Sequence, residues 1–390
     1  MPSTFSPRQP CTSAIPPNGI STFVIRLSNP YAEGPLNNTN RLENEVAASD
    51  LIRQSLDRSG LGSLVPSIYA WKPTKYPQLR DESGFGWTIS EFKNGEDLDS
   101  QFEEMDEESA IGAVQQLAKI FALMQSTRLP HSASNFGGLS IDERGDIISA
   151  QSTLVHGGPW ESYVEHWVGK LQQKLSDADA SATLQGWKCS SVRERLEQFI
   201  ASGKIQNLLK EVDCDQRVLV HGDFSEFLFV AFGGSILTYT LSAMNNILYD
   251  KSTRHITALL DFDWASVTHP CEEFLSGLWD VGGGIHERVG NLQSSVLSGN
   301  FGKEPDGVPQ EDIRKWKVAR AWDGALLQNG AIRPSDIAGV QGIRTLKELE
   351  DLICPFVLGC EFFANRLSEE DRLRKKGDTE DAILKLLDGA

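Results

Sequence analysis

The sequence predicts an α+β protein with two lobes, a small sheet-rich lobe followed by a larger and mostly helical one. Short β-branched and apolar runs such as Ser21–Leu27 and Trp87–Phe92 mark the first part of the chain and are typical of strands. From Glu107 onward, apolar residues recur every three or four positions, which is typical of amphipathic helices. The chain has 390 residues, 40% of them hydrophobic and 23% charged, so both lobes can bury a core.

The small lobe is predicted to span residues 21–95, after a loose Pro- and Ser-rich arm at residues 1–20. Between its strands, Leu42, Val46 and Leu51 recur at helical spacing, so a helix is expected there. The lobe is therefore expected to be a small mixed sheet with one helix.

Residues 96–390 are predicted to form the helical lobe, with a hairpin at its centre. Its expected elements are, in order, helices from Glu107 to the stop at Pro130, over Trp160–Leu175 and over Val192–Val212, strands over Arg217–Val220, Asn246–Asp250 and His255–Phe262, and a closing helix over Thr379–Leu387. The turn DKSTR separates the last two strands, so these are expected to form the hairpin.

The charge balance excludes several classes of partner. The chain has 37 Lys and Arg against 54 Asp and Glu, a net charge of −17. Nucleic acids and anionic membranes are bound through basic faces, so neither is expected as a partner. The six cysteines are scattered without metal-binding spacing, and the N-terminal stretch lacks the apolar core of a signal peptide. These features predict a cytoplasmic protein with reduced thiols.

Two acidic clusters follow apolar runs. His221-Gly222-Asp223 comes directly after RVLV, and Asp261-Phe262-Asp263 comes after TALL. Carboxylates at the ends of buried strands are costly unless they bind a cation or a partner. Together with Asn246, they offer the oxygen ligands that a hard cation such as Mg²⁺ prefers. The alternative is that the aspartates only cap turns at the ends of strands.

The order of these residues fits phosphoryl transfer, but the spacing does not. In kinases the catalytic Asp and the metal-binding Asn are five residues apart, whereas Asn246 lies 23 residues beyond Asp223. The separation exceeds the kinase spacing by 18 positions, which is the length of the mostly apolar stretch at residues 226–243. We interpret this insert as an unspliced intron translated in frame, and alternatively as a genuine apolar loop or hairpin. Gly233-Gly234 interrupts it, which disfavours a membrane span.

The segments HGDFS, MNNILYD and ITALLDFDWAS, with RLENEVAA and WTISEFKNGEDLD upstream, resemble the aminoglycoside phosphotransferase and choline-kinase-like family, in particular its fungal branch. The resemblance runs from about Ser21 to about Leu275 and more weakly through the C-terminal helices. It implies a protein-kinase-like bilobal fold and an ATP- and Mg²⁺-dependent transfer of phosphate to the hydroxyl of a small molecule.

The resemblance also implies roles for eight residues. Asp223 would be the catalytic base, and Asn246 and Asp261 would be the metal ligands. The other five would bind the nucleotide: Arg26 on its phosphates, Glu45 as the ion-pair partner of Arg26, and Ser90, Glu91 and Phe92 as the hinge that contacts adenine through backbone groups.

Two departures from the family pattern support an alternative function. The glycine-containing hairpin that the family places ahead of the VIRL strand is shortened or missing, and the catalytic loop is split by residues 226–243. The alternative is a catalytically impaired pseudokinase that binds nucleotide or a partner. The acidic run that begins at Glu96 is interpreted as a solvated face, and alternatively as an attraction for a cationic acceptor.

Overall fold

A computed structural model gives the structure of the chain. It describes residues 22–29, 31, 38, 40–74, 82–224, 226–227, 241–242, 244–278, 281–285, 291–305 and 307–389. The predicted arm at residues 1–20, the position expected for a glycine hairpin, and residues 228–240 of the insert lie outside the described residues.

The strands form several small antiparallel ladders. They are β1 (Phe23–Ser28), β2 (Ile68–Lys72), β3 (Gly86–Glu91), β4 (Glu96–Asp97), β5 (Gly138–Ile141), β6 (Ile147–Ala150), β7 (Val218–Val220), β8 (Glu226–Phe227), β9 (Leu241–Ser242), β10 (Ile247–Asp250), β11 (His255–Leu259) and β12 (Ser266–Thr268).

The helices lie mostly after β4. They are α1 (Arg41–Asp57), α2 (Leu98–Phe102), α3 (Glu107–Gln125), α4 (Tyr163–Ala180), α5 (Val192–Ala201), α6 (Lys204–Leu208), α7 (Cys271–Ser276), α8 (Asn291–Ser298), α9 (Gln310–Gln328), α10 (Val340–Ile353), α11 (Phe356–Gly359), α12 (Glu361–Ala364) and α13 (Glu369–Gly389).

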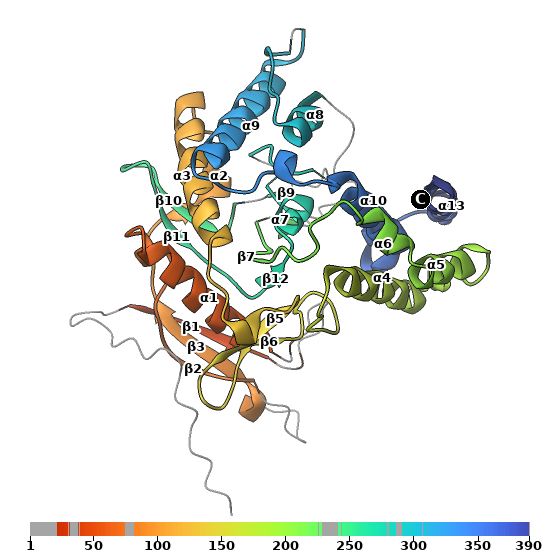
Figure 1. The fold of residues 1–390 in the computed structure, drawn as a ribbon, viewed down its shortest axis with the longest axis horizontal. Helices are drawn as coiled ribbons and strands as arrows, with labels where there is room; N and C mark the ends of the chain where they lie inside the picture. The colour runs from red at the N-terminus through yellow and green to blue at the C-terminus, as the bar shows by residue number, and fades with distance from the viewer. Residues whose placement is uncertain are drawn as a thin grey trace, which may run out of the picture.

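The small lobe is a three-stranded antiparallel sheet in the order β1-β3-β2, with α1 beside it (Figure 1). The register pairs Arg26 with Thr88, so both side chains lie on one face of the sheet. Helix α1 buries its apolar residues, including Val46 and Ile52. It also packs on β5, so one helix connects the sheet to the helical lobe.

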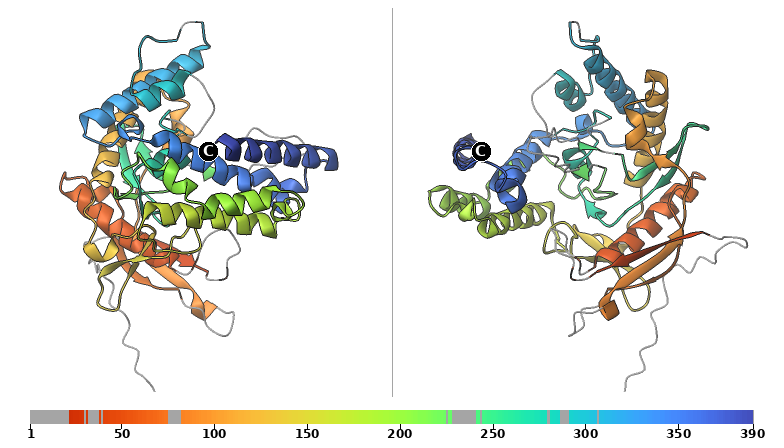
Figure 2. Two further views of the ribbon diagram at one scale, coloured as in Figure 1. Left: turned by 45° about the vertical axis from the view of Figure 1, so that its right-hand side comes forward. Right: turned by 180° about the vertical axis from the view of Figure 1, so that it is seen from behind.

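The helical lobe has two helical ends with short strands between them. Helices α3 and α9 pack together at one end, and α4, α5, α10 and α13 gather at the other (Figures 1 and 2). Of these strands, β7 pairs with β12, and β10, which lies beside α3, pairs with both β11 and β4 (Figure 1). The structure confirms the α+β bilobal fold and the predicted hairpin, which is β10–β11.

One predicted helix is wrong. The range Val192–Val212 is divided into α5 and α6 because Gly203 adopts a left-handed φ of +77° between them. This conformation cannot continue a right-handed helix. Within the described part of the chain, no helix is both long and apolar enough to cross a membrane.

Candidate functional site

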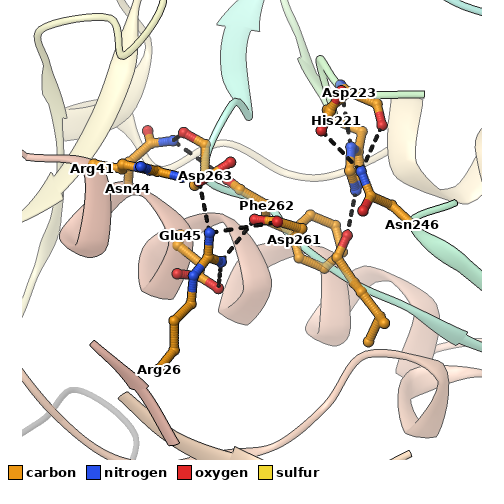
Figure 3. Close-up of polar contacts among 11 residues, drawn as sticks. Arg26, Arg41, Asn44, Glu45, His221, Asp223, Asn246, Asp261, Phe262 and Asp263 are labelled. Atoms are coloured by element: carbon orange, nitrogen blue, oxygen red, sulfur yellow. Dashed lines mark hydrogen bonds and ion pairs between the residues drawn. The ribbon is translucent and has the colours of Figure 1, made fainter. Parts of the chain in front are cut away.

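Arg26 is the centre of an ion cluster at the boundary between the lobes. Its Nη1 donates to Glu45 Oε1 at 2.9 Å and to Asp261 Oδ1 at 2.7 Å (Figure 3). Its Nη2 donates to Asp263 Oδ2 at 2.9 Å. Arg26 lies on β1 and Glu45 on α1, whereas both aspartates follow β11. The cluster therefore joins two neighbouring elements of the small lobe to a segment 235 positions away in the sequence.

The charges in this cluster shift one another's pKa. Burial alone would lower the pKa of Arg26, but the three carboxylates raise it overall. Burial and repulsion from the two aspartates raise the pKa of Glu45 to about 7, against the opposing effect of Arg26. Burial also acts to raise the pKa of Asp261, but Arg26 lowers it overall. Asp261 is therefore held ionised by its contact with Arg26.

The two aspartates have different surroundings. Arg41, at the start of α1, donates from Nε to Asp263 Oδ2 at 2.6 Å and contacts the same oxygen through Nη2. The side chain of Asp263 is only 2% exposed, whereas that of Asp261 is 35% exposed. Asp261 also has a left-handed φ of +60°, a strained conformation for a residue with a side chain. Asp261 is thus the accessible carboxylate, and Asp263 is anchored between two arginines.

The His221-Gly222-Asp223 turn follows β7, whose three residues are all buried. Gly222 has a φ of +80°, and a Cβ at this position would lie 2.5 Å from the carbonyl oxygen of Trp264. Glycine alone tolerates both the conformation and the contact. The turn therefore holds Asp223 close to the segment that carries the second acidic cluster.

His221 connects this turn to the second acidic cluster. Its Nε2 lies 2.8 Å from the carbonyl oxygen of Leu260, and its Nδ1 accepts the N–H of Asp223 at 3.3 Å. Burial lowers the pKa of His221 to about 4, so the ring is neutral at pH 7 and these contacts assign its proton to Nε2. The N–H of Leu260 donates to the carbonyl oxygen of Asn246 at 2.8 Å. Leu260, which precedes Asp261, is thus hydrogen-bonded both to the side chain of His221 and to the backbone of Asn246.

Asn246 contacts Asp223 directly. Its Nδ2 donates to Asp223 Oδ2 and to the Asp223 carbonyl oxygen, each at 2.9 Å (Figure 3). The intervening insert leaves and returns at one place, because β8 and β9 pair antiparallel, with Glu226 opposite Ser242 and Phe227 opposite Leu241. The structure therefore places these two residues together although 23 positions separate them.

A buried carboxylate holds the backbone of the His221-Gly222-Asp223 turn. Glu273 on α7 accepts the N–H of His221 at 2.7 Å and the N–H of Gly222 at 3.1 Å. Burial raises the pKa of Glu273 to about 7, although both hydrogen bonds oppose the rise. A carboxylate that receives two backbone N–H groups of this turn fixes its conformation.

The preceding residue, Glu272, points to the other end of the helical lobe. It accepts the hydroxyl of Tyr163 at 2.7 Å and the ammonium of Lys170 at 2.9 Å, both from α4. Burial alone would raise the pKa of Glu272, but Lys170 and its other polar neighbours lower it to about 2. Consecutive residues of α7 thus bond to α4 and to the turn that carries Asp223.

The three residues expected at the hinge lie at the end of β3. Ser90 and Glu91 pair with Val24 and Phe23 of β1, and Phe92 follows with 48% of its surface exposed. The Glu91 side chain accepts Lys93 Nζ at 2.6 Å and the backbone N–H of Ser67 at 3.0 Å. These residues thus lie where the small lobe leads into the helical one.

The donor set fits a divalent cation that also binds substrate oxygens. Asn246 uses its amide N–H groups on Asp223, which leaves its Oδ1 as the atom for a cation, and Asp261 presents an ionised carboxylate. Among the described residues, no three His, Cys, Asp or Glu side chains form a preassembled metal cluster. A metal held by Asn246 and Asp261 would therefore take its remaining ligands from phosphate and water.

Sequence reasoning missed three residues of the site: Arg41, Glu273, and Asn44, whose side-chain amide donates to the carbonyl oxygens of Asp263 and Ala265. Arg41 and Asn44 lie in RLENEVAA one helical turn apart, a spacing that puts both on one side of α1. Glu273 lies in CEEFL beside a second glutamate, Glu272. The two side chains have the same chemistry, but Glu272 contacts α4 and Glu273 contacts the turn that carries Asp223. A single sequence carries no signal that separates such residues from solvated charges.

Comparisons with known proteins give matches among solved structures alone. No protein-family model and no curated protein matches the chain. Among solved structures, the chain is similar to aminoglycoside phosphotransferase APH(4)-Ia, with 14% identity, a TM-score of 0.39, and coverage of 93% of this chain and 86% of that one. It is also similar to APH(2")-IIa in its gentamicin complex, with 13% identity, a TM-score of 0.40 and coverage of 86% and 81%. At these values, activity has to be argued from the residues of this chain.

Proposed function

We propose that this protein is a small-molecule kinase, which transfers the γ-phosphate of ATP to the hydroxyl of a small acceptor with Mg²⁺ as cofactor. The contact between Asn246 and Asp223 carries the proposal, since kinases bring a catalytic Asp and an Asn together beside a second Asp that binds the metal. Asp261 follows Leu260, whose backbone is bonded to Asn246 and to His221. A cytoplasmic location suits a protein that uses ATP and contains free cysteines.

In this mechanism, Asp223 accepts the proton of the acceptor hydroxyl as the hydroxyl oxygen attacks. A bond forms between that oxygen and the γ-phosphorus, and the bond from the γ-phosphorus to the β–γ bridging oxygen breaks, which leaves ADP. Asn246 orients Asp223 through its two hydrogen bonds. His221 and Glu273 keep the backbone of the turn in place.

The remaining residues bind the nucleotide. Arg26, oriented by Glu45, would hold phosphate oxygens, and Ser90, Glu91 and Phe92 would contact adenine through backbone groups. Asn246 and Asp261 would hold the cation. When bound, Mg²⁺ neutralises the charge that develops on the phosphate oxygens.

The test is ADP formation from ATP and Mg²⁺ with a panel of hydroxyl-bearing metabolites, including cationic ones. Asp223→Asn is expected to lower acceptor-dependent ADP formation by about 10²- to 10⁴-fold and to leave the thermal shift caused by nucleotide intact. Asp215→Asn is the matched control, because Asp215 is exposed in the segment that leads into β7. Equal turnover by Asp223→Asn and the unmodified chain would refute the assignment of the base.

The pseudokinase alternative predicts another pattern. It requires nucleotide binding without acceptor-dependent ADP formation over the whole panel, in the full chain and in a chain that lacks residues 226–243. That result would overturn the proposed kinase activity.

A further inference from the structure

Asn44 connects α1 to two segments of the helical lobe. Its side-chain amide Nδ2 faces three carbonyl oxygens, those of Ala265 at 2.8 Å, Asp263 at 3.1 Å and Phe262 at 3.5 Å. Its Oδ1 accepts the N–H of Leu139 on β5 at 2.6 Å. Asn44 is 0% exposed, so water does not replace these partners.

The residues contacted by the Asn44 amide directly follow Asp261. Arg41, one helical turn earlier, binds the side chain of Asp263, so α1 holds this segment through both a side chain and the backbone (Figure 3). Asn44 also precedes Glu45, which is bonded to Arg26, and Arg26 is bonded to Asp261. The contacts thus close a ring from Asn44 through Glu45, Arg26 and Asp261 back to the segment that Asn44 holds.

Asn44 has the donor that this place requires. Converging carbonyl oxygens repel one another unless an N–H group lies between them, and a buried carbonyl without a partner is costly. Aspartate has the same shape and keeps the acceptor for Leu139, but an ionised carboxylate has no proton to donate. The left-handed conformation of Asp261 is strained and persists only where its neighbours hold it.

We propose that Asn44 is a positioning residue for Asp261. By holding residues 262–265 against α1, Asn44 keeps the Asp261 carboxylate in the place where it binds a divalent cation, at a fixed distance from the Arg26–Glu45 pair. The part of this inference that concerns the cation rests on the proposed function.

The experiment compares Asn44→Asp with Asn40→Asp in the full chain. Asn40 is a matched control, because its amide donates to the carbonyl oxygens of Leu139 at 3.1 Å and Gln151 at 2.9 Å and not to residues 262–265. Two quantities are measured: the affinity for Mn²⁺, by electron paramagnetic resonance with a non-hydrolysable ATP analogue present, and the hydrogen exchange of residues 256–268.

Asn44→Asp is expected to weaken Mn²⁺ binding by about tenfold or more, the loss that one unsatisfied buried polar group produces, and to accelerate exchange in residues 262–268. Asn40→Asp is expected to lower the melting temperature without either effect. Equal Mn²⁺ affinities or equal exchange in the two variants would overturn the proposal. If Asn44→Asp does not fold, Asn44→Ala replaces it with Asn40→Ala as its control, since alanine also lacks the donor, and the same outcomes apply.

The two failures are distinguishable. If the unmodified chain binds neither nucleotide nor Mn²⁺, the proposed function is wrong, and the exchange of residues 262–268 still decides whether Asn44 holds this segment. If the unmodified chain binds both and Asn44→Asp binds them equally well, the positioning role of Asn44 is wrong and the proposed function stands.

Discussion

The side-chain amide of Asn246 donates to Asp223 twice, to Oδ2 and to the backbone carbonyl oxygen, each at 2.9 Å. The two residues are 23 positions apart, and the chain between them begins and ends with the β8–β9 ladder. Because the two strands of this ladder pair with each other, the insert leaves and returns at the same place. The contact between Asn246 and Asp223 therefore does not depend on the length of the insert.

Deletion of residues 226–243, the ladder included, is expected to preserve the proposed kinase activity, because it restores the spacing of five residues that kinases have between this Asp and Asn. Turnover should stay within about threefold of the full chain. This limit is a sensitive measure of position, because a displacement of Asp223 by about 1 Å would already cost about a hundredfold. The measurement is the rate of ADP formation by both chains under identical conditions. A fall of a hundredfold with an unchanged melting temperature would mean that the insert itself positions Asp223.

Gly222→Ala is expected to destabilise the fold by about 3 kcal/mol or more, since it adds a steric clash to an unfavourable left-handed φ. Gly60→Ala is the matched control, because Gly60 has a similar φ of +71° but no atom within 4 Å of the added Cβ. It should cost only about 1 kcal/mol. Urea unfolding measures both, and equal losses would contradict the contact with Trp264.

Replacing Arg26 by Met should destabilise the protein more at pH 8 than at pH 5. Without the guanidinium, the folded-state pKa values of Glu45, Asp261 and Asp263 rise, and the stability associated with a raised pKa is lost as the pH rises through it. We expect a loss of about 1–2 kcal/mol at pH 8, because the cluster is partly exposed.

Arg26→Lys is the control, since it keeps the charge but cannot reach the carboxylates with a planar fork. It should recover part of the stability at pH 8. A loss that is the same at both pH values for Arg26→Met would show that packing, and not charge, explains the effect.

Glu273→Gln should flatten the dependence of stability on pH. The folded-state pKa of Glu273 is raised to about 7, so its contribution is complete below its ordinary value near 4.5 and is lost as the pH rises through 7. An amide at this position does not titrate, so the decline in the free energy of unfolding with rising pH should become smaller by about 3 kcal/mol. Urea unfolding between pH 5 and pH 8 measures it.

Glu272→Gln provides the comparison, because the pKa of Glu272 is lowered to about 2. Its contribution is present above its ordinary pKa and is lost only in strong acid. This variant should lower stability by a similar amount at pH 5 and pH 8, since Lys170 loses its ion pair with Glu272 at both values and keeps that with Glu350. If both variants flatten the profile equally, the assignment of the titration to Glu273 is wrong.

Much of the fold follows from local patterns in the sequence. The β-branched run FVIRLS and the apolar spacing of RLENEVAASDLI predict β1 and α1, because a strand needs one apolar face and a helix needs an apolar stripe. The exception is α5–α6, where Gly203 breaks an otherwise continuous helical pattern. A glycine inside such a pattern is compatible with a helix, so its conformation is decided by tertiary packing.

The site is less accessible to such reasoning. Asp223 and Asp261 are marked by the apolar runs before them, whereas Asn44 and Glu273 are polar residues within helices and resemble solvated positions. Their contacts are set by the docking of α1 and α7 against turns far away in the sequence. Pairing of backbone N–H and C=O groups with distant side chains has no periodic signature in a single sequence.

The adjacency of Glu272 and Glu273 has a consequence for how this scaffold changes over time. Glu272 is hydrogen-bonded to α4, and Glu273 is hydrogen-bonded to the turn that carries Asp223. A shift of α4 is therefore transmitted through α7 to this turn. We expect substitutions that displace α4 to alter the turnover of the proposed kinase. Over evolutionary time, a chain that changes Tyr163 or Lys170 therefore has to replace their support for α7 to keep the proposed activity.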